Sequence, residues 1–276
     1  MALNSVNTNF GAMVALENLS TTQQDLQHTQ QVINTGMKVA TAKDNGAVWA
    51  IAQNQRAQST SLDSVKDSLA RGQSAIDVAM AAGQSISDLL TQMKAKALAA
   101  SDSTLDQTSR DALNSDFTSL RDQVTTIVNN ADFNGVNMVK NGGTNIMAIA
   151  NADGTSKITV LAQDLSLGGA NVTVSSTGTI GTATTASGMI ATLQTSINNV
   201  SASLAQLGTG SSALDRHMSF VTKLQDTINN GVGNLVDADL AKESAHLQAL
   251  QTKQQLGFQA LSIANSSTSP LLSLFR

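Results

Sequence analysis

The segment that decides the fold runs from residue 62 to residue 100 and reads LDSVKDSLARGQSAIDVAMAAGQSISDLLTQMKAKALAA. Its apolar and small residues alternate between spacings of three and four along the whole segment, which is the pattern of a coiled-coil seam. No charged residue interrupts this stripe, whose members are Leu62, Val65, Leu69, Gly72, Ile76, Ala79, Gly83, Ile86, Leu90, Met93, Ala97 and Ala100. The segment therefore predicts a long helix that packs against other helices along one narrow face.

Two other segments carry the same spacing. The first follows Thr104 and Gln107, whose separation is that of a capping box, and its stripe is Leu113, Phe117, Leu120, Val124, Ile127 and Ala131. The second has thirteen stripe positions, of which only two are polar: Leu193, Ile197, Val200, Leu204, Leu207, Ser211, Leu214, Met218, Val221, Gln225, Ile228, Val232 and Leu235. A stripe this narrow is buried only when another helix covers it, so we predict a bundle of three rods. We expect its intramolecular seam to join Leu69, Ile76, Ile86 and Leu90 to Leu193, Leu204, Leu207, Leu214, Val221 and Ile228.

Composition supports long helices and excludes several other classes. Of the 276 residues 41% are apolar but only 3% are aromatic, which is typical of an aliphatic bundle rather than a thick globular core. The single proline is Pro270, so no proline interrupts a helix before that position. The chain has no cysteine, which excludes a disulfide scaffold, a thiolate metal site and a cysteine nucleophile. A net charge of −4 gives no basic footprint for nucleic acid. Protein is therefore the expected partner.

Targeting signals are also not expected. Residues 1–10 contain no basic residue and no long apolar run, so we expect no cleavable secretory signal. No later segment approaches the roughly 18 uncharged apolar residues that a membrane span requires. If the chain is exported, it leaves the cell by another route.

The centre of the chain, residues 135–188, differs from its flanks. It holds nine of the nineteen glycines and is rich in threonine, serine, asparagine and valine. Ile158, Val160 and Ala162 alternate, as do Val172 and Val174, and three Asn-Gly or Asp-Gly steps supply tight-turn chemistry. This composition predicts short β-hairpins between helical arms.

The two ends of the chain resemble each other in kind. Residues 1–42 contain three charged side chains and residues 237–276 contain six, while glutamine and asparagine are abundant in both. Each end predicts an amphipathic helix with a thin apolar stripe: Leu16, Leu19, Leu26 and Ile33 at one end, and Leu240, Leu247, Leu250 and Leu261 at the other. Such a helix buries too little apolar area to offset its ordering entropy alone. We therefore expect these polymerisation arms to become ordered when copies of the chain pack together.

Five motifs, in the same order along the chain, resemble those of bacterial flagellins, in particular the short alphaproteobacterial kind. They are the opening MALNSVNTN at residues 1–9; Gly36-Met37-Lys38 with Ala42-Lys43-Asp44 and Ala50-Ile51-Ala52; Phe133-Asn134-Gly135-Val136; Val236-Asp237-Ala238-Asp239 with Glu243 and Ser244; and the end LLSLFR at residues 271–276. Five motifs in the correct order are far more specific than any one of them.

The resemblance implies a mainly α fold, an elongated helical coiled-coil bundle of paired N- and C-terminal arms with a small central β-hairpin region. Residues 1–42 and 237–276 would form an inner coiled-coil domain that lines the filament channel. Residues 43–236 would form an outer helical rod domain that includes the β/turn region 135–188. The implied function is that of a structural subunit, exported and assembled head-to-tail into the extracellular filament used for swimming. The implied partners are the chain itself, other flagellins, the filament cap, hook-associated junction proteins, an export chaperone and the type III export gate.

The sequence departs from the family pattern in places. Asn45 stands where a second aspartate is common, and the arginine usual before the Asp-Ala-Asp run is absent. These departures put particular salt bridges between subunits in doubt. We still expect Lys43, Asp44, Asp237 and Asp239 to lie near subunit contacts, the alternative being that they are solvated helix ends.

Catalytic interpretations find little support. Residues 208–213, GTGSSA, formally fit a dinucleotide fingerprint, but a helical seam precedes them where a strand is required. His28, His217 and His246 are far apart and show no metal-binding spacing, so no cofactor or metal is expected and the chain is not expected to be an enzyme. The remaining alternatives are a hook-to-filament junction protein, which would carry a longer and more divergent body, and a helical signalling module, which would carry more charge.

Overall fold

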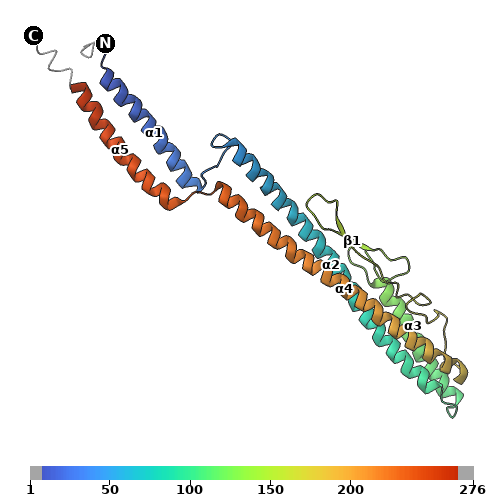
Figure 1. Ribbon diagram of the computed structural model, residues 1–276. Helices are drawn as coiled ribbons and strands as arrows, with labels where there is room; N and C mark the ends of the chain where they lie inside the picture. The colour runs from blue at the N-terminus through green and yellow to red at the C-terminus, as the bar shows by residue number, and fades with distance from the viewer. Residues whose placement is uncertain (1–7, 267–276) are drawn as a thin grey trace, which may run out of the picture. The chain divides into compact units, whose positions relative to one another are not determined.

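The computed structural model describes residues 8–266. These residues form five α-helices and one two-stranded antiparallel sheet (Figure 1). In chain order the elements are α1 (Phe10–Thr35), α2 (Gly46–Ala100), α3 (Gln107–Asn130), β1 (Ile146–Ile149), β2 (Lys157–Val160), α4 (Ala183–Val236) and α5 (Leu240–Ser266). The prediction of a mainly α fold with helical arms at both ends and a small central hairpin is confirmed. None of the helices in the described range is apolar enough to cross a membrane.

The chain divides into two compact units. The terminal unit joins the residues up to Ala57 with those from Thr227 onward, and the central unit is Gln58–Asp226. The sequence-based division was placed after residues 42 and 236, near the ends of helices, whereas the compact units divide inside α2 and α4.

In the central unit, α2 and α4 run antiparallel. The side chains of Gln73 and Ser211 are hydrogen-bonded at 2.6 Å, and Lys66 Nζ donates to Gln225 Oε1 at 2.7 Å. Gly83 of α2 lies against the side chain of Leu204, where an added Cβ would be only 2.7 Å from Leu204 Cδ2. Residues later in α2 therefore contact residues earlier in α4. Figure 1 shows α3 beside these two helices.

The core of the central unit is aliphatic apart from one phenylalanine. Its largest fully buried side chains on the three helices are Leu62, Leu69, Ile76, Ile86, Leu90 and Met93 of α2, Phe117 of α3, and Leu193 and Leu207 of α4. Leu214 and Val221 continue the buried stripe of α4. Burial follows the alternating spacing of three and four because this spacing keeps one stripe of each helix facing its neighbours.

The turn between α2 and α3 differs from the sequence-based expectation. We expected Thr104 to cap the second helix, but α3 begins at Gln107 and its cap is Asp106, whose Oδ1 accepts a hydrogen bond from the Ser109 N–H at 2.8 Å. The backbone N–H of Ser109 lowers the pKa of Asp106 because it stabilises the charged carboxylate. Thr104 instead donates its backbone N–H to Asp102 at 2.8 Å, which makes it part of the preceding turn.

The region between α3 and α4 holds one β-hairpin. β1 and β2 pair antiparallel with Ile146 opposite Val160, and the turn between them contains Gly154 at φ 69°. The prediction of strands at Val172 and Val174 was wrong. Both side chains are fully buried, but among the described residues this segment forms only an isolated bridge, between Leu167 and Val172. Their alternation reflects burial of an irregular segment rather than sheet pairing.

The hairpin packs on α4 through a glycine. A Cβ added to Gly210 would be 2.5 Å from Val160 Cγ1, so a side chain at position 210 would collide with β2. The Gly208–Ala213 segment lies inside α4, which removes the strand-to-helix turn that a dinucleotide fingerprint requires. Gly210 is therefore a packing residue.

Candidate assembly interface

The terminal unit is built on an antiparallel pair of helices, α1 and α5 (Figure 1). Asn9 Nδ2 donates to the carbonyl oxygen of Ala264 at 2.7 Å, close to the start of α1 and the end of α5. Farther along, Gln254 Nε2 donates to Gln23 Oε1 at 2.7 Å. Near the other end, the hydroxyl of Thr29 lies 3.3 Å from Nδ1 of His246. These pairs fix the direction and the register of the two helices.

The seam between α1 and α5 is thin and partly polar. The buried residues of α1 are Thr22, Leu26, Thr29 and Val32, so half of them are threonines. Within α5, all of which is described, Leu250 is the one buried residue. Gly257 provides a hole for Leu19, whose Cδ1 lies 3.1 Å from where a Cβ would stand. Such a seam buries little apolar surface for two helices of this length.

The predicted arm residues divide into three groups by burial. Leu26 and Leu250 are buried in the α1/α5 seam. Leu19, Ile33, Leu247 and Leu261 are half-buried. Leu16 and Leu240 are exposed, at 57% and 47% of their surface. The opening residues 1–7 and the end LLSLFR, which carried part of the family resemblance, lie outside the described residues.

A group of large apolar side chains is exposed where α1 starts and α5 ends. On α1 these are Phe10, Met13, Val14 and Leu16, and on α5 they are Leu256, Phe258 and Ile263; we call them the exposed apolar set. Phe10 is 75% exposed and Ile263 69%. Since the helices are antiparallel, both parts of the set lie toward the same end of the pair. An apolar concentration of this kind marks a surface that another protein covers.

At the other end of the pair, the chain passes between helices through a short bridge. Gly36 ends α1 with φ 69°, and Met37 forms an antiparallel bridge with Asp237. The Lys38 N–H donates to the Val236 carbonyl at 2.7 Å, and the Ala238 N–H donates to the Gly36 carbonyl at 2.9 Å. A small core lies beside it, formed by Val39, Ala52, Val232 and Val236 and covered by Met37, Val48, Trp49, Ile228 and Leu235.

The four charged residues expected at subunit contacts are all exposed in the single chain. Asp44 Oδ2 accepts hydrogen bonds from the backbone N–H groups of Thr41 and Ala40 at 2.9 and 3.0 Å. The Thr41 N–H is the main cause that lowers the pKa of Asp44. Asp239 Oδ1 accepts from the Ala241 N–H at 3.0 Å at the start of α5. Two of the four, Asp44 and Asp239, therefore stabilise local backbone, while Asp237 lies in the bridge with Met37.

Asn45 takes part in the same local structure. Its side-chain oxygen accepts a hydrogen bond from the Val48 N–H at 3.1 Å, in the first turn of α2. Asparagine is as good a helix cap as aspartate, so the departure from the family pattern at this position leaves the cap intact.

The residues predicted to form the long seam are divided between the two units. In the central unit, Leu69, Ile76, Ile86 and Leu90 of α2 and Leu193, Leu207, Leu214 and Val221 of α4 are buried. Leu204 is half-buried against Gly83. Ile228 belongs to the terminal unit, where it covers the small core of Val39 and Val236.

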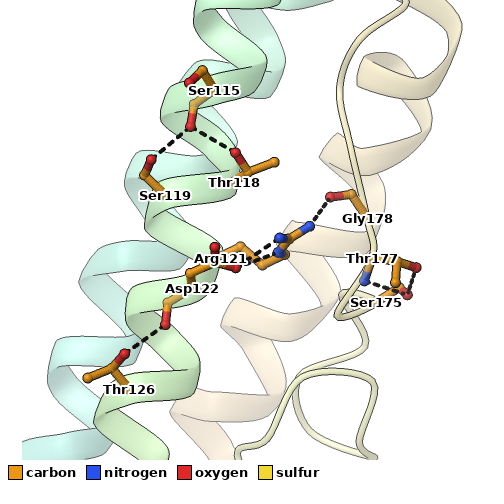
Figure 2. Close-up of polar contacts among 9 residues, drawn as sticks. All are labelled: Ser115, Thr118, Ser119, Arg121, Asp122, Thr126, Ser175, Thr177 and Gly178. Atoms are coloured by element: carbon orange, nitrogen blue, oxygen red, sulfur yellow. Dashed lines mark hydrogen bonds and ion pairs between the residues drawn. The ribbon is translucent and has the colours of Figure 1, made fainter.

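Two arginines with structural roles were missed by sequence reasoning. Arg110 is buried, at 6% exposure, and donates to the carbonyl oxygens of Ala100 at 2.6 Å and Leu105 at 3.0 Å. It thereby satisfies carbonyls at the end of α2 and in the following turn that have no partner within the helix. Arg121 reaches from α3 to the Gly178 carbonyl at 3.1 Å and to Asp122 at 2.8 Å (Figure 2). The sequence around an arginine in a polar helix does not show whether its side chain contacts a carbonyl oxygen or is exposed to solvent.

The histidines lie apart and make separate contacts. His217 Nε2 is 2.7 Å from the Ala150 carbonyl, beside the hairpin turn, and His246 contacts Thr29. Among residues 8–266, no three histidine, cysteine or carboxylate side chains come together in a way that could hold a metal ion. The polar groups described above cap helices, close turns and fix registers.

Comparison with known proteins identifies the family. The model of the bacterial flagellin N-terminal helical region matches residues 6–144, and that of the C-terminal helical region matches residues 190–275. This chain belongs to the bacterial flagellins. Flagellin FljO of Caulobacter vibrioides is 58% identical over 276 residues, which is 100% of both chains. A flagellin of Brucella melitensis is 36% identical over 99% of both chains.

A solved structure agrees with the fold. The crystal structure of Bacillus cereus flagellin matches with a TM-score of 0.50 and 24% identity, covering 56% of this chain and 88% of that one. The resemblance inferred from the five sequence motifs is thus confirmed, including its alphaproteobacterial character. A flagellin is a structural subunit of the extracellular flagellar filament and not an enzyme, so the expected role as a filament subunit is confirmed as well.

Proposed function

We propose that the chain is exported unfolded and self-assembles head-to-tail, and that its α1/α5 pair supplies the contacts that hold the polymer together. The observation that carries the proposal is the exposed apolar set at one end of this pair. A head-to-tail contact whose rotation does not close produces an open helix, so one subunit species is sufficient for a filament.

The energetics favour association at this surface. Burying one large aliphatic or aromatic side chain contributes about 1.5–3 kcal/mol, and the set contains seven apolar side chains. The intramolecular seam is comparatively weak, since two of the four buried residues of α1 are threonines. Neighbouring copies therefore supply apolar area that the α1/α5 pair lacks, and ordering of the arms is coupled to polymerisation.

We also propose an inner position for the arms in the filament. Residues 1–42 and 237–276 would form the inner coiled-coil domain around the filament channel, and residues 43–236 the outer rod domain with its β/turn region at 135–188. Support comes from the helix breaks near these boundaries, at Gly36 and between Val236 and Leu240.

Export and capping bring further partners. We include among these a chaperone, the type III export gate, hook-associated junction proteins and the filament cap, along with other flagellins in the same filament. The chain has no cysteine, so no disulfide opposes passage in an unfolded state. Family membership supplies the rest of the support.

A double substitution in the exposed apolar set tests the assembly surface. Leu256 and Ile263 lie seven residues apart on one face of α5, and both are exposed. Replacing both with aspartate places two charges where the polymer would bury apolar surface. We expect the critical concentration for seeded polymerisation to rise by roughly a hundredfold or more. Sedimentation and electron microscopy measure this concentration. A truncated chain that lacks residues 237–276 should form no filament in the same assay.

The matched control is the double variant Gln255→Asp and Gln259→Asp, which adds the same charge to exposed polar positions of the same helix. It should polymerise at nearly the normal concentration. Equal loss in both double variants would mean that charge rather than burial controls assembly. Normal filaments from the Leu256 and Ile263 variant would overturn the proposed surface.

The charged residues beside the bridge need a separate test. We propose that Lys43, Asp44, Asp237 and Asp239 lie near subunit contacts, and Lys43→Gln with Asp237→Asn removes the two that do not cap backbone groups. A subunit contact predicts a shifted salt dependence of polymerisation with an unchanged unfolding curve of the monomer. An unchanged salt dependence would mean that these charges are solvated.

A further inference from the structure

Four asparagines are followed directly by glycine, at positions 45, 134, 141 and 230. This dipeptide is chemically labile because the glycine backbone nitrogen can attack the asparagine side-chain carbonyl without hindrance from a Cβ. The reaction requires that the nitrogen be free of hydrogen bonds and that the side chain and peptide unit be able to rotate toward each other. The four sites differ in these respects.

Three of the sites are held in place. Asn45 caps α2: its Oδ1 accepts the Val48 N–H at 3.1 Å and its backbone carbonyl accepts the Trp49 N–H at 2.9 Å, so its side chain and its peptide unit are both fixed. Gly231 lies inside α4, where helical hydrogen bonding and dihedral angles keep its nitrogen from the Asn230 side chain. Gly135 lies in a tight turn in which Asn134 and Gly135 both have positive φ, at 53° and 82°. Its N–H donates to the carboxylate of Asp132 at 2.8 Å, and Phe133 and Val136 exchange two backbone hydrogen bonds of 3.0 Å around it.

The fourth site, Asn141–Gly142, is open to reaction. The Gly143 N–H donates to the Lys140 carbonyl at 2.9 Å and Gly142 has φ 65°, which together describe a type II turn. Within the described residues, the Gly142 N–H has no hydrogen-bond acceptor. Gly142 carries no side chain and nothing lies within 4 Å of a Cβ added to it, so the peptide unit between Asn141 and Gly142 has room to rotate, although Gly143 packs against the backbone of residues 137–140.

We propose that Asn141 is a site of spontaneous deamidation, and that its product places a second carboxylate beside Asp164. The Gly142 nitrogen loses its proton to water and forms a bond to Asn141 Cγ, while the Cγ–Nδ2 bond breaks and ammonia leaves. Water then opens the five-membered succinimide at either carbonyl, giving aspartate or isoaspartate at position 141. Neither an oxidant nor an enzyme is required.

The consequence follows from what Asn141 contacts. Its Nδ2 donates to Asp164 Oδ2 at 3.1 Å, so the reaction replaces a donor with a negative charge. Asp164 also accepts the Ser166 N–H at 2.9 Å, which keeps its carboxylate in place. Like charges at this distance repel each other, and the contact between the 140–143 turn and the 164–169 loop is lost. The change weakens the region between α3 and α4 as the protein ages.

Mass spectrometry of tryptic peptides tests the proposal directly. Trypsin separates the four sites into residues 44–56, 122–140, 141–157 and 224–242. The full-length protein is incubated at mildly alkaline pH, folded or in urea, and the deamidated fraction of each site is followed with time. In the folded chain we expect position 141 to react roughly tenfold faster than positions 45, 134 and 230, while in urea the four rates converge. A folded-state rate at 141 no faster than at the other three would overturn the proposal.

Two variants test the physical cause. Asp132→Ala releases the Gly135 N–H from its charged acceptor, and position 134 should then react roughly tenfold faster in the folded protein. An unchanged rate at 134 would contradict the role given to the hydrogen bond. Asn141→Asp has the same side chain as the aspartate product of deamidation, and it should lower the thermal midpoint of the central unit. Asn141→Gln keeps the amide group and serves as the control. Equal midpoints for these two variants would overturn the predicted repulsion from Asp164.

Discussion

The central and terminal units are both built from long paired helices, yet they bury different side chains. The central unit encloses three helices around leucine, isoleucine and valine, with Phe117 among them. In the terminal unit, α1 buries two threonines beside two apolar residues, and α5 buries Leu250. The same length of helix is therefore supported by much less apolar contact in the terminal unit.

The difference shows how one chain can be stable in part and dependent on partners in part. Burial of a helix on several sides stabilises it without help, whereas a single thin seam leaves apolar side chains such as Phe258 in water. The central unit is thus expected to fold by itself, and the terminal unit to gain most of its stability from neighbouring subunits. The following substitutions test this comparison, from the largest effect to the smallest.

The largest effect is expected from truncating the central core. Leu207 is fully buried, and Leu207→Ala should lower the free energy of unfolding of the central unit by about 2–5 kcal/mol. Urea denaturation followed by circular dichroism measures it. The matched variant Leu250→Ala should leave this transition in place and instead raise the concentration needed for polymerisation. Similar losses in the main transition for both variants would remove the distinction between the units.

The next effect concerns the end of α2. Arg110→Met keeps the length of the side chain but removes the donors to Ala100 and Leu105, so a buried carbonyl oxygen at the end of α2 and a part-buried one in the following turn lose their partner. We expect a loss of about 1–3 kcal/mol in the unfolding free energy. Arg216→Met, on an exposed face of α4, is the control and should change it by less than about 0.5 kcal/mol. A loss no greater than that of the control would mean that water replaces the guanidinium at no cost.

Smaller changes in the thermal midpoint, of opposite sign at Gly208 and Gly210, test how the hairpin packs on α4. Gly208 has open space where a Cβ would stand, so Gly208→Ala should raise the thermal midpoint, reflecting about 0.5–1 kcal/mol of helix propensity. Gly210→Ala would place its methyl group 2.5 Å from Val160 Cγ1 and should lower the midpoint. Thermal unfolding of the two variants compares them, and a rise in both would show that the hairpin moves aside freely.

The smallest effect is the acid dependence of the turn between α2 and α3. The backbone N–H of Thr104 lowers the pKa of Asp102, and that of Ser109 lowers the pKa of Asp106, so both carboxylates are stabilised in the folded state. Their contribution is present above the ordinary aspartate pKa of about 3.9 and is lost as pH falls through the lowered folded values. Denaturation midpoints measured across this range should fall more for the natural chain than for Asp102→Asn with Asp106→Asn. Parallel curves would mean that the two caps contribute nothing to stability.

Most of the helical architecture could be predicted because it depends on a repeating pattern. The stripe from Leu62 to Ala100 identified the greater part of α2, which begins at Gly46, and one of its small residues, Gly83, packs against Leu204. The cap of α3 was misplaced because Thr104 and Asp106 are both good caps, and only the turn geometry chooses between them. The Val172 and Val174 alternation predicted a strand, since periodicity does not distinguish a buried irregular segment from sheet.

The exposed apolar set shows the same limit in the candidate interface. The repeating apolar spacing predicts the residues that face the partner helix within the chain, such as Leu26 and Leu250. It does not identify Phe10 or Phe258, which lie off the stripe and are exposed. Arg110 and Gly210 were missed because their roles depend on tertiary neighbours, namely the end of α2 and the side chain of Val160.

The bridge between Met37 and Asp237 has a consequence for the alignment of the arms. A polar seam with a regular repeat has nearly equivalent alignments one heptad apart, separated by a slide of about 10 Å. The bridge ties the last turn of α1 to the start of α5 through the Lys38–Val236 and Ala238–Gly36 hydrogen bonds, and it allows only one of these alignments. Every copy of the chain therefore presents its apolar side chains at the same height, as a helical lattice of identical subunits requires.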